Sequence, residues 1–351
     1  MRLAWLERRE ETRAQTLALA PLVPCAWLYG AAAWLARASR ERGPWPPRRL
    51  PLRVVSVGNL LVGGTGKTPF AAWLAASLVR RGRKAALASR GYGRRGREPV
   101  QVVSDGRFVR ASAESAGDEP IWLAGHAPGV PVLVGRDRGV VGLRALSAFG
   151  AEVLVLDDGF QHHRLARDVD FVCFDGAFGL GNGFVLPRGP LREPAGALRR
   201  ADALVVVDGP LPEPDAARIG ALAPGARRVT VRRRAASLRS LAGGGAVSPE
   251  ALDGAPVGLL TGVARPQSVR RTLEEVGARV VALRVFPDHH HYKPRDLAGL
   301  REEAPLWVTT EKDAVKLVPA WAGRADLRVL ALELEVDEGE ALLDWLESRL
   351  R

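Results

Sequence analysis

The sequence predicts an α/β fold made of two successive α/β units. Short apolar runs alternate with helix-length segments from about residue 53 onward, which is the pattern of parallel βαβ units. A glycine-rich turn, Gly63 to Gly66, separates one such run from a helical segment. A basic, glycine-containing connector after about Arg233 separates the two sets of runs, and 351 residues are enough for two domains.

The domain boundaries that we expect follow these changes in composition. An N-terminal helical segment is expected over residues 1–45, a first α/β domain over 46–230 and a smaller α/β domain over 231–351. The proline-rich stretch Gly43–Arg49 is typical of a stiff linker that leads into the first domain.

The N-terminal segment is apolar enough to associate with a membrane. Leu17–Ala36 carries no charged side chain, and as one straight helix it would span about 30 Å. Pro21 and Pro24 interrupt it, arginines flank it on both sides, and aromatic residues lie within it. These features favour a segment that lies in the headgroup region. A transmembrane helix and an ordinary buried helix are the alternatives.

Buried strands and amphipathic helices are expected in a regular order. In the first domain the expected strands are Arg53–Val57, Lys84–Ser89, Val132–Val134, Val153–Asp157, Phe171–Phe174 and Leu204–Val207, with a helix over Thr68–Arg80. In the second domain they are Val257–Leu260, Arg279–Phe286, Leu306–Thr309 and Val329–Val336, with helices over Pro266–Val276 and Glu338–Leu350.

The stretch SVGNLLVGGTGKTP, Ser56–Pro69, predicts a phosphate-binding loop although it departs from the usual pattern. The Walker pattern places a glycine where Leu61 stands. A strand nevertheless precedes the turn and a helix follows it, so the backbone N–H groups can surround a phosphate. Lys67 is placed to reach the β- and γ-phosphates of ATP, and the Thr68 hydroxyl to bind Mg²⁺. The alternative is a structural glycine turn. The predicted nucleotide-binding residues are Leu61, Val62, Gly63, Gly64, Thr65, Gly66, Lys67 and Thr68.

The carboxylates that such a loop requires follow another expected strand. Val153–Leu156 leads directly into Asp157 and Asp158. Carboxylates at the end of a neighbouring strand can bind Mg²⁺ directly or through water. We predict that one aspartate lies on the metal side and the other contacts it indirectly or contacts substrate; the sequence does not say which.

The composition restricts the classes of partner. The net charge is +12, and this charge either solvates the surface or attracts phosphates and anionic membranes. No zinc finger, RNP pattern or basic zipper is present in the sequence, so no nucleic-acid partner is expected. Two cysteines cannot form a disulfide framework, which fits a reducing compartment. Only five of the 51 basic residues are lysines, and one of them is Lys67.

Eight motifs in fixed order resemble those of the tetraacyldisaccharide 4'-kinases of lipid A biosynthesis, from about residue 15 to the C-terminus. They are SVGNLLVGGTGKTP, SRGYGR (Ser89–Arg94), GDEP (Gly117–Pro120), VGRDR (Val134–Arg138), LDDGFQHHRLARDVD (Leu156–Asp170), LPRGPLREP (Leu186–Pro194), FPDHHHY (Phe286–Tyr292) and TTEKDAVKL (Thr309–Leu317). The family's loop also lacks the early glycine.

The resemblance implies Mg²⁺- and ATP-dependent phosphorylation of the 4'-hydroxyl of a tetraacyl disaccharide 1-phosphate. It also implies a P-loop α/β/α core, a smaller α/β domain, linker strands, and a peripheral or monotopic location on the cytoplasmic face of the inner membrane of a Gram-negative bacterium. We expect a monomer. By motif, Asp118 and His289 match the family's catalytic pair, and His290 or His291 would replace His289 if the register is shifted.

The acceptor lipid carries a phosphate and sugar hydroxyls. Arginines can bind phosphate through two hydrogen bonds, and a tyrosine can stack on a sugar. The predicted substrate-binding residues are Arg90, Tyr92, Arg136, Arg138, Arg188 and Arg192. For Glu311, Lys312 and Asp313, contact with the nucleotide and locking of the domain interface are the two roles that stay open. For Asp118, helix N-capping is the structural alternative.

Two other functions remain open on the residues alone. A membrane-surface P-loop ATPase that acts as a switch would have the same loop and aspartates without a small-molecule acceptor. A basic ATPase that binds nucleic acid is the other, and its binding would be strongly salt-dependent.

Overall fold

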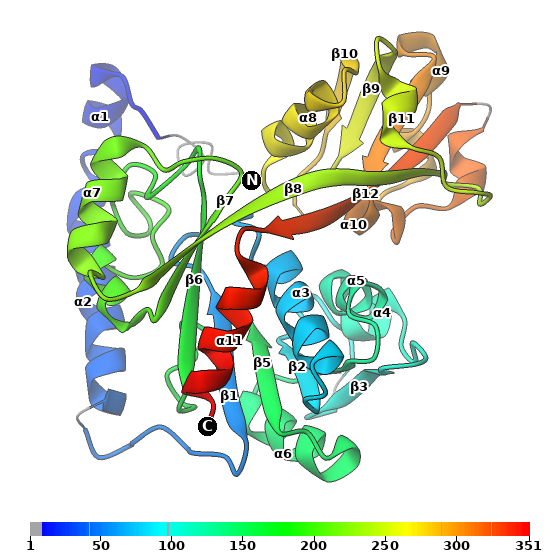
Figure 1. Ribbon diagram of the computed structural model, residues 1–351. Coiled ribbons are helices and arrows are strands. Elements are labelled where there is room, and N and C mark those ends of the chain that lie inside the picture. The colour runs from blue at the N-terminus through cyan, green and yellow to red at the C-terminus, as the bar shows by residue number, and fades with distance from the viewer. Residues whose placement is uncertain (1–8, 42, 97, 289, 324) are drawn as a thin grey trace.

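The computed structural model describes residues 9–41, 43–96, 98–288, 290–323 and 325–351. In this part of the chain twelve strands form one continuous twisted sheet in the order β10-β9-β11-β12-β8-β7-β6-β1-β5-β2-β4-β3 (Figure 1). The strands are β1 (Arg53–Gly58), β2 (Ala85–Ser89), β3 (Gln101–Asp105), β4 (Pro131–Val134), β5 (Val153–Asp157), β6 (Val169–Asp175), β7 (Ala203–Val207), β8 (Arg227–Ser240), β9 (Pro256–Thr261), β10 (Arg279–Val285), β11 (Leu306–Thr310) and β12 (Asp326–Val336).

The helices cover both faces of this sheet. They are α1 (Arg13–Leu19), α2 (Leu22–Glu41), α3 (Lys67–Arg80), α4 (Ala113–Ala116), α5 (Asp118–His126), α6 (Arg138–Phe149), α7 (Glu213–Leu222), α8 (Pro266–Glu275), α9 (Leu300–Glu303), α10 (Glu311–Ala314) and α11 (Gly339–Arg349). Every strand and helix expected from the sequence is present, to within a few residues at the ends. The antiparallel edge strand β3 was not expected.

The part of the sheet from β7 to β3 and the helices packed on it form the first of two bodies. This first body has three layers because successive strand residues point to opposite faces of the sheet. In β1, Val55 and Val57 join one core with α3, α5 and α11, whereas Val54 joins another under α6. A third core, with Leu60, Phe160 and Phe174, lies beside α7. The predicted P-loop-type three-layer α/β/α core is confirmed. Parallel pairing of β5, β1 and β6 brings their carboxyl ends to the same edge.

The second body is built on β9, β10 and β11 with α8 on one side, and two long strands connect it to the first body (Figure 1). The expected connector after Arg233 lies within β8, which pairs antiparallel with β12. In β8, Val231 joins the core of the first body and Leu238 joins the core of the second. The sheet is therefore continuous between the two bodies.

The last helix returns to the first body. Leu342, Leu343 and Leu346 of α11 are buried against α3 and β6, and Arg81 pairs with Asp344 at 2.7 Å. Helix α11 thus packs into the first hydrophobic core, although it falls in the range 231–351 that was expected to form the smaller domain. The physical reason is that the apolar stripe of α11 finds its buried partner there.

The N-terminal segment forms two helices with a bend between them. Pro24 lies in the first turn of α2, where a missing N–H is tolerated, so only Ala20 and Pro21 interrupt the helix. Most of the apolar side chains of α2 are exposed, Trp27 and Leu28 among them, which excludes the ordinary buried helix. No single helix in the described ranges is long and apolar enough to cross a membrane; α1 and α2 pass that test only as a pair bent by 62°.

Candidate functional site

A cleft of about 1710 Å³ lies where the two bodies meet at the carboxyl ends of the parallel strands. Segments after β1, β2, β4 and β5 line it from the first body, and segments after β9, β10 and β11 line it from the second. Open α/β sheets bind their ligands at this edge because loops and helix N-termini converge there.

The glycine loop has the geometry of a phosphate cradle. Gly63 and Gly66 have positive φ of 105° and 79°, and Gly66 immediately precedes α3. A side chain at Gly66 would lie 3.0 Å from Val207, so both the backbone conformation and the space require glycine there. Asn59 is fully buried and braces the loop: its amide donates to the Thr65 hydroxyl at 2.9 Å and to the Gly63 carbonyl at 3.3 Å. Asn59 was not among the residues predicted from the sequence; its place between a strand and the glycines was the available signal.

Leu61 shows why the first glycine of the Walker pattern is dispensable here. Its side chain is fully buried in the cluster with Leu60, Phe160 and Leu191. It forms a bridge with Leu191 and needs no positive φ. This position therefore anchors the loop by packing, while Val62 through Thr68 line the cleft.

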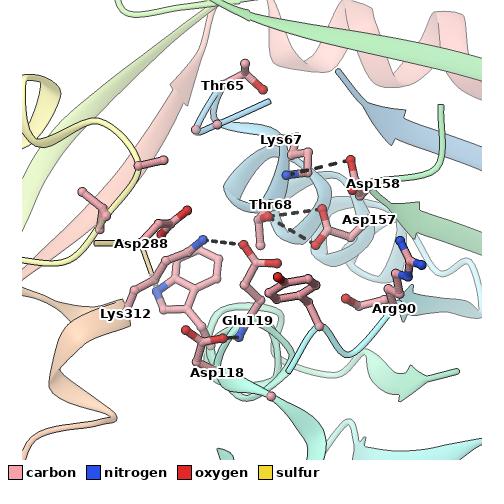
Figure 2. A pocket seen from close by; sticks show the side chains of 18 of the residues that line it. Thr65, Lys67, Thr68, Arg90, Asp118, Glu119, Asp157, Asp158, Asp288 and Lys312 are labelled. Atoms are coloured by element: carbon pink, nitrogen blue, oxygen red, sulfur yellow. Dashed lines mark hydrogen bonds and ion pairs between the residues drawn. The ribbon is translucent and has the colours of Figure 1, made fainter. Parts of the chain in front are cut away.

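Thr68 and Asp157 form the candidate metal site. The Thr68 hydroxyl donates to both Asp157 oxygens at 3.2 and 3.3 Å, and both residues are buried at the cleft (Figure 2). Burial raises the pKa of Asp157, the charge of Glu119 adds to this, and Lys67 opposes it. In the described part of the chain no cluster of three or more His, Cys, Asp or Glu residues could hold a metal. An all-oxygen pair fits Mg²⁺, which takes few protein ligands and completes its coordination with water and phosphate.

Asp158 takes a different role from Asp157. It has a positive φ of 59°, and its carboxylate lies 3.9 Å from the Lys67 ammonium (Figure 2). The same carboxylate accepts from Arg192 at 2.8 Å. Burial would raise the pKa of Asp158, but Lys67 and Arg192 outweigh it and lower the pKa. Burial would likewise lower the pKa of Lys67, but Asp158 and Glu119 raise it. Asp157 thus pairs with the Thr68 hydroxyl, whereas Asp158 pairs with the cations Lys67 and Arg192.

Asp118 and Glu119 face the second body from the start of α5. Asp118 is the first helical residue and Gly117 precedes it with a φ of 97°, so Asp118 does not occupy the N-cap position. Glu119 accepts from Lys312 of α10 at 2.8 Å, and Lys316 lies 3.8 Å from Asp118 (Figure 2 shows the Glu119 pair). Neither Glu119 nor Lys316 was a candidate in the sequence analysis, because both depend on a contact between segments far apart in the chain.

The segment Thr310–Asp313, with the sequence TEKD, lies at the interface between the two bodies. The Glu311 carboxylate accepts a hydrogen bond from the His126 ring at 2.8 Å, and the other ring nitrogen of His126 lies 2.8 Å from the Trp122 carbonyl. Asp313 is buried within the second body. Of the two roles left open for this segment, the structure shows contacts across the interface, and Glu311 and Lys312 also line the cleft.

In the histidine run 289–291, the two described residues, His290 and His291, have different surroundings. His289 lies outside the described residues. His290 points to Asp296 at 2.9 Å and stacks on Phe286, and it does not line the cleft, whereas His291 and Asp288 do.

The predicted substrate-binding residues gather in the cleft with one exception. Arg90, Tyr92, Arg136, Arg138 and Arg192 all line it. Arg188 does not join them.

Arg188 is only 2% exposed and makes two hydrogen bonds to Glu11, at 2.6 and 2.5 Å. This position does not support the predicted role of Arg188 in substrate binding, because the guanidinium edge that would bind a phosphate is held by the Glu11 carboxylate. This pair instead ties the N-terminal segment before α1 to the first body.

His162 also lines the cleft, next to Gln161. Burial and then the charge of Arg138 lower the pKa of His162 to about 4, so its ring is neutral near pH 7. A neutral imidazole can accept or donate a hydrogen bond to an uncharged ligand group.

Comparison with known proteins gives a consistent result. Residues 18–351 match the family described as Tetraacyldisaccharide-1-P 4'-kinase. The chain is 46% identical to the tetraacyldisaccharide 4'-kinase of Anaeromyxobacter dehalogenans (strain 2CP-C), covering 97% of this chain and 92% of the relative. It is 40% identical to that of Dechloromonas aromatica (strain RCB), covering 99% and 97%.

A solved structure is similar over almost the full length. The LpxK of Aquifex aeolicus, an "apo" form crystallised in complex with ATP, superposes with a TM-score of 0.74 at 30% identity and covers 95% of this chain and all of the other.

Proposed function

The chain belongs to the tetraacyldisaccharide 4'-kinase family, and we propose that it transfers the γ-phosphoryl group of ATP to the 4'-hydroxyl of a tetraacyl disaccharide 1-phosphate. One observation carries the proposal beyond family membership. The phosphate cradle of Lys67 and Thr68 opens onto the same cleft as the Asp118 carboxylate, with arginines along the cleft wall. A phosphoryl donor and a hydroxyl acceptor can therefore meet there.

In the proposed reaction the 4'-oxygen attacks the γ-phosphorus in line with the leaving oxygen of ADP. The new O–P bond forms as the bond from phosphorus to ADP breaks, and the hydroxyl proton passes to the Asp118 carboxylate. Lys67 stabilises the charge on the transferred group. Thr68 and Asp157 would hold Mg²⁺, which neutralises phosphate charge when bound. His289 stays the expected partner of Asp118.

We assign recognition of the acceptor's 1-phosphate and sugar groups to the cleft arginines. Arg90 and Arg136 are exposed in the cleft and Tyr92 is 67% exposed, so their polar ends can contact a ligand. Arg138 is almost fully buried and its guanidinium donates to the Arg136 carbonyl at 3.1 Å, which supports the loop that carries Arg136. Arg192 is paired with Asp158 and supports the catalytic end of the cleft.

The location that we propose is the cytoplasmic face of the inner membrane of a Gram-negative bacterium, where an acylated disaccharide resides. Two features support it. The exposed face of α2 carries Trp27, Leu28 and Leu35, with arginines nearby. The same helix contributes Tyr29 and Arg40 to the cleft wall, so a membrane-bound α2 would place the cleft beside the bilayer.

The proposal is tested with γ-labelled ATP, Mg²⁺ and a tetraacyl disaccharide 1-phosphate in vesicles. The parent protein should label the lipid, and Asp118→Ala and Lys67→Ala should each lower the rate by at least about 100-fold. ATP turnover without labelled lipid would favour the surface ATPase switch instead. Full activity of Asp118→Ala would exclude the assigned base.

A further inference from the structure

The ammonium group of Lys316 lies between two carboxylates that belong to different bodies. It is 3.8 Å from Asp118, at the start of α5 in the first body, and 3.2 Å from Asp313 of α10 in the second. The three side chains are only 10%, 13% and 0% exposed. Water therefore screens these charges weakly, so the contacts are stronger than surface ion pairs.

Buried groups of the second body hold the Lys316 ammonium in place. One oxygen of the Asp313 carboxylate accepts three hydrogen bonds, from the Thr310 hydroxyl at 2.8 Å and from the Thr261 hydroxyl and the Gly262 N–H at 3.0 Å. The other oxygen is left to face Lys316. Because three donors on β9 and β11 orient the carboxylate, the position of the ammonium is set by the sheet of the second body.

An aromatic ring completes the enclosure. Lys316 lies over the ring of Tyr292 at 5.6 Å from its centroid, which is within the range of a cation–π contact. Gly262 makes room for this arrangement: a side chain there would lie 3.0 Å from the Tyr292 hydroxyl and 3.2 Å from Asp313.

Asp118 is oriented from both sides. One carboxylate oxygen accepts the N–H of Glu119 at 3.0 Å, and the other faces Lys316. Gly117, with its positive φ, packs so closely on Tyr92 that a side chain would lie 2.7 Å from the Tyr92 carbonyl. The first body therefore fixes the backbone of Asp118, and the second body supplies the cation beside its side chain.

We propose that Lys316, anchored by Asp313, is a positioning residue that holds the Asp118 carboxylate ionised and oriented for the transfer. This inference rests on the proposed role of Asp118 as the proton acceptor. A cation within about 4–6 Å favours the charged form of a carboxylate. The base is then complete only when the second body is docked against α5.

Other charged groups near Asp118 have their own partners or directions. Glu119 pairs with Lys312, and Glu311 pairs with His126. Asp288 and His291 face the cleft from the loop after β10. Lys312 is thus committed to the neighbouring carboxylate, and Lys316 is the lysine of this segment that serves Asp118.

The test measures lipid phosphorylation against pH at saturating ATP and lipid for Lys316→Met and Lys316→Arg. Without the ammonium, the acidic limb of the rate profile should move upward by about one pH unit or more and kcat should fall about 10- to 100-fold. The KM for ATP should stay within about twofold. Lys316→Arg keeps the positive charge, so the acidic limb of its rate profile should lie at the same pH as that of the parent protein.

The control is Arg270→Met, which removes an exposed ion pair with Glu274 and should leave the profile unchanged. If Lys316→Met does not fold because Asp313 loses its counter-ion, Lys316→Met with Asp313→Asn carries the same expectation. If Asp118→Ala is inactive and Lys316→Met keeps the pH profile of the parent protein, the role of Lys316 is overturned while Asp118 remains the base. A fully active Asp118→Ala would overturn the proposed base as well.

Discussion

Leu61 is the residue at which a familiar pattern and the actual structure disagree. It stands where the Walker pattern has glycine, and its side chain is completely buried beneath the loop. The backbone there needs no left-handed conformation, so glycine would add flexibility without a benefit.

The substitution Leu61→Gly, which restores the Walker pattern, should therefore lower the stability of the folded protein. We expect a loss of about 3–5 kcal/mol in the free energy of unfolding, because a buried leucine is removed and the loop gains conformational freedom. Urea unfolding measures this loss. Val140→Ala, on the outer face of α6, is the control and should change the stability by less than about 0.5 kcal/mol. Unchanged stability of Leu61→Gly would show that the packing of Leu61 is unimportant.

At the scale of the elements, the N-terminal helices are attached by polar contacts, of which the Glu11–Arg188 pair is the most buried, and by packing. Glu11 precedes α1 and pairs with Arg188, and Gly30 of α2 lies against Val185 and Pro194. The Arg188 hydrogen bonds lower the pKa of Glu11, so this carboxylate is charged in the folded protein.

Arg188→Met should release the start of α1 without removing the nucleotide site. Breaking a buried pair from one side costs about 3–5 kcal/mol, because the remaining Glu11 carboxylate loses its counter-ion and keeps only the neutral donors Asn182 and Thr16. Limited trypsin digestion should cut at Arg13 more than tenfold faster than in the parent, while ATP binding is retained. Arg199→Met, on an exposed side chain, is the matched control. An unchanged cleavage rate would mean that packing alone holds the helix.

The exposed face of α2 should matter only when the substrate is in a membrane. Replacing Trp27, Leu28 and Leu35 with serine removes apolar side chains that are 63–73% exposed, so folding should be unaffected. We expect at least about a tenfold loss of activity on vesicles and no change in ATP binding. Equal activity of parent and variant on vesicles would contradict membrane docking through this face.

At the scale of the whole molecule, the contact between the two bodies is partly ionic and includes a titratable histidine. The His126 ring stacks on Trp122 in α5 and meets Glu311 of α10. Burial would lower the pKa of His126, but the hydrogen bond and the charge of Glu311 outweigh it and raise the pKa. A raised pKa in the folded state means that the stabilisation is fully present below the unfolded pKa of about 6.5 and is lost as the pH rises through the folded value.

Glu311→Gln should therefore destabilise the protein more at pH 6 than at pH 9, by about 1 kcal/mol in the free energy of unfolding. Urea unfolding at the two pH values measures the difference. Glu303→Gln removes an exposed carboxylate that pairs with Arg284, and its effect should be the same at both values because an arginine does not titrate there. An equal loss for Glu311→Gln at both pH values would mean that His126 stays neutral in the folded protein.

Much of the fold could be predicted from the sequence because it depends on local patterns. Runs such as Val153–Leu156 are apolar throughout because parallel strands are covered on both faces. Strand β3 was missed because only two of its five residues are buried and it pairs antiparallel at the edge of the sheet. The second half of the long strand β8 was interpreted as a connector because its run of arginines, Arg232–Arg234, is typical of a solvated linker.

The phosphate loop, the two aspartates after β5 and the kinase family could be inferred from the amino-acid sequence alone, since each is carried by residues adjacent in the chain. The folded structure was needed to show that Asp157 lies with Thr68 and Asp158 with Lys67, that Arg188 pairs with Glu11, and that Lys316 reaches Asp118. The physical reason is the same for each of these contacts. Their partners come from segments far apart in the chain, and burial, which gives the charges their strength, exists only after the two bodies have packed together.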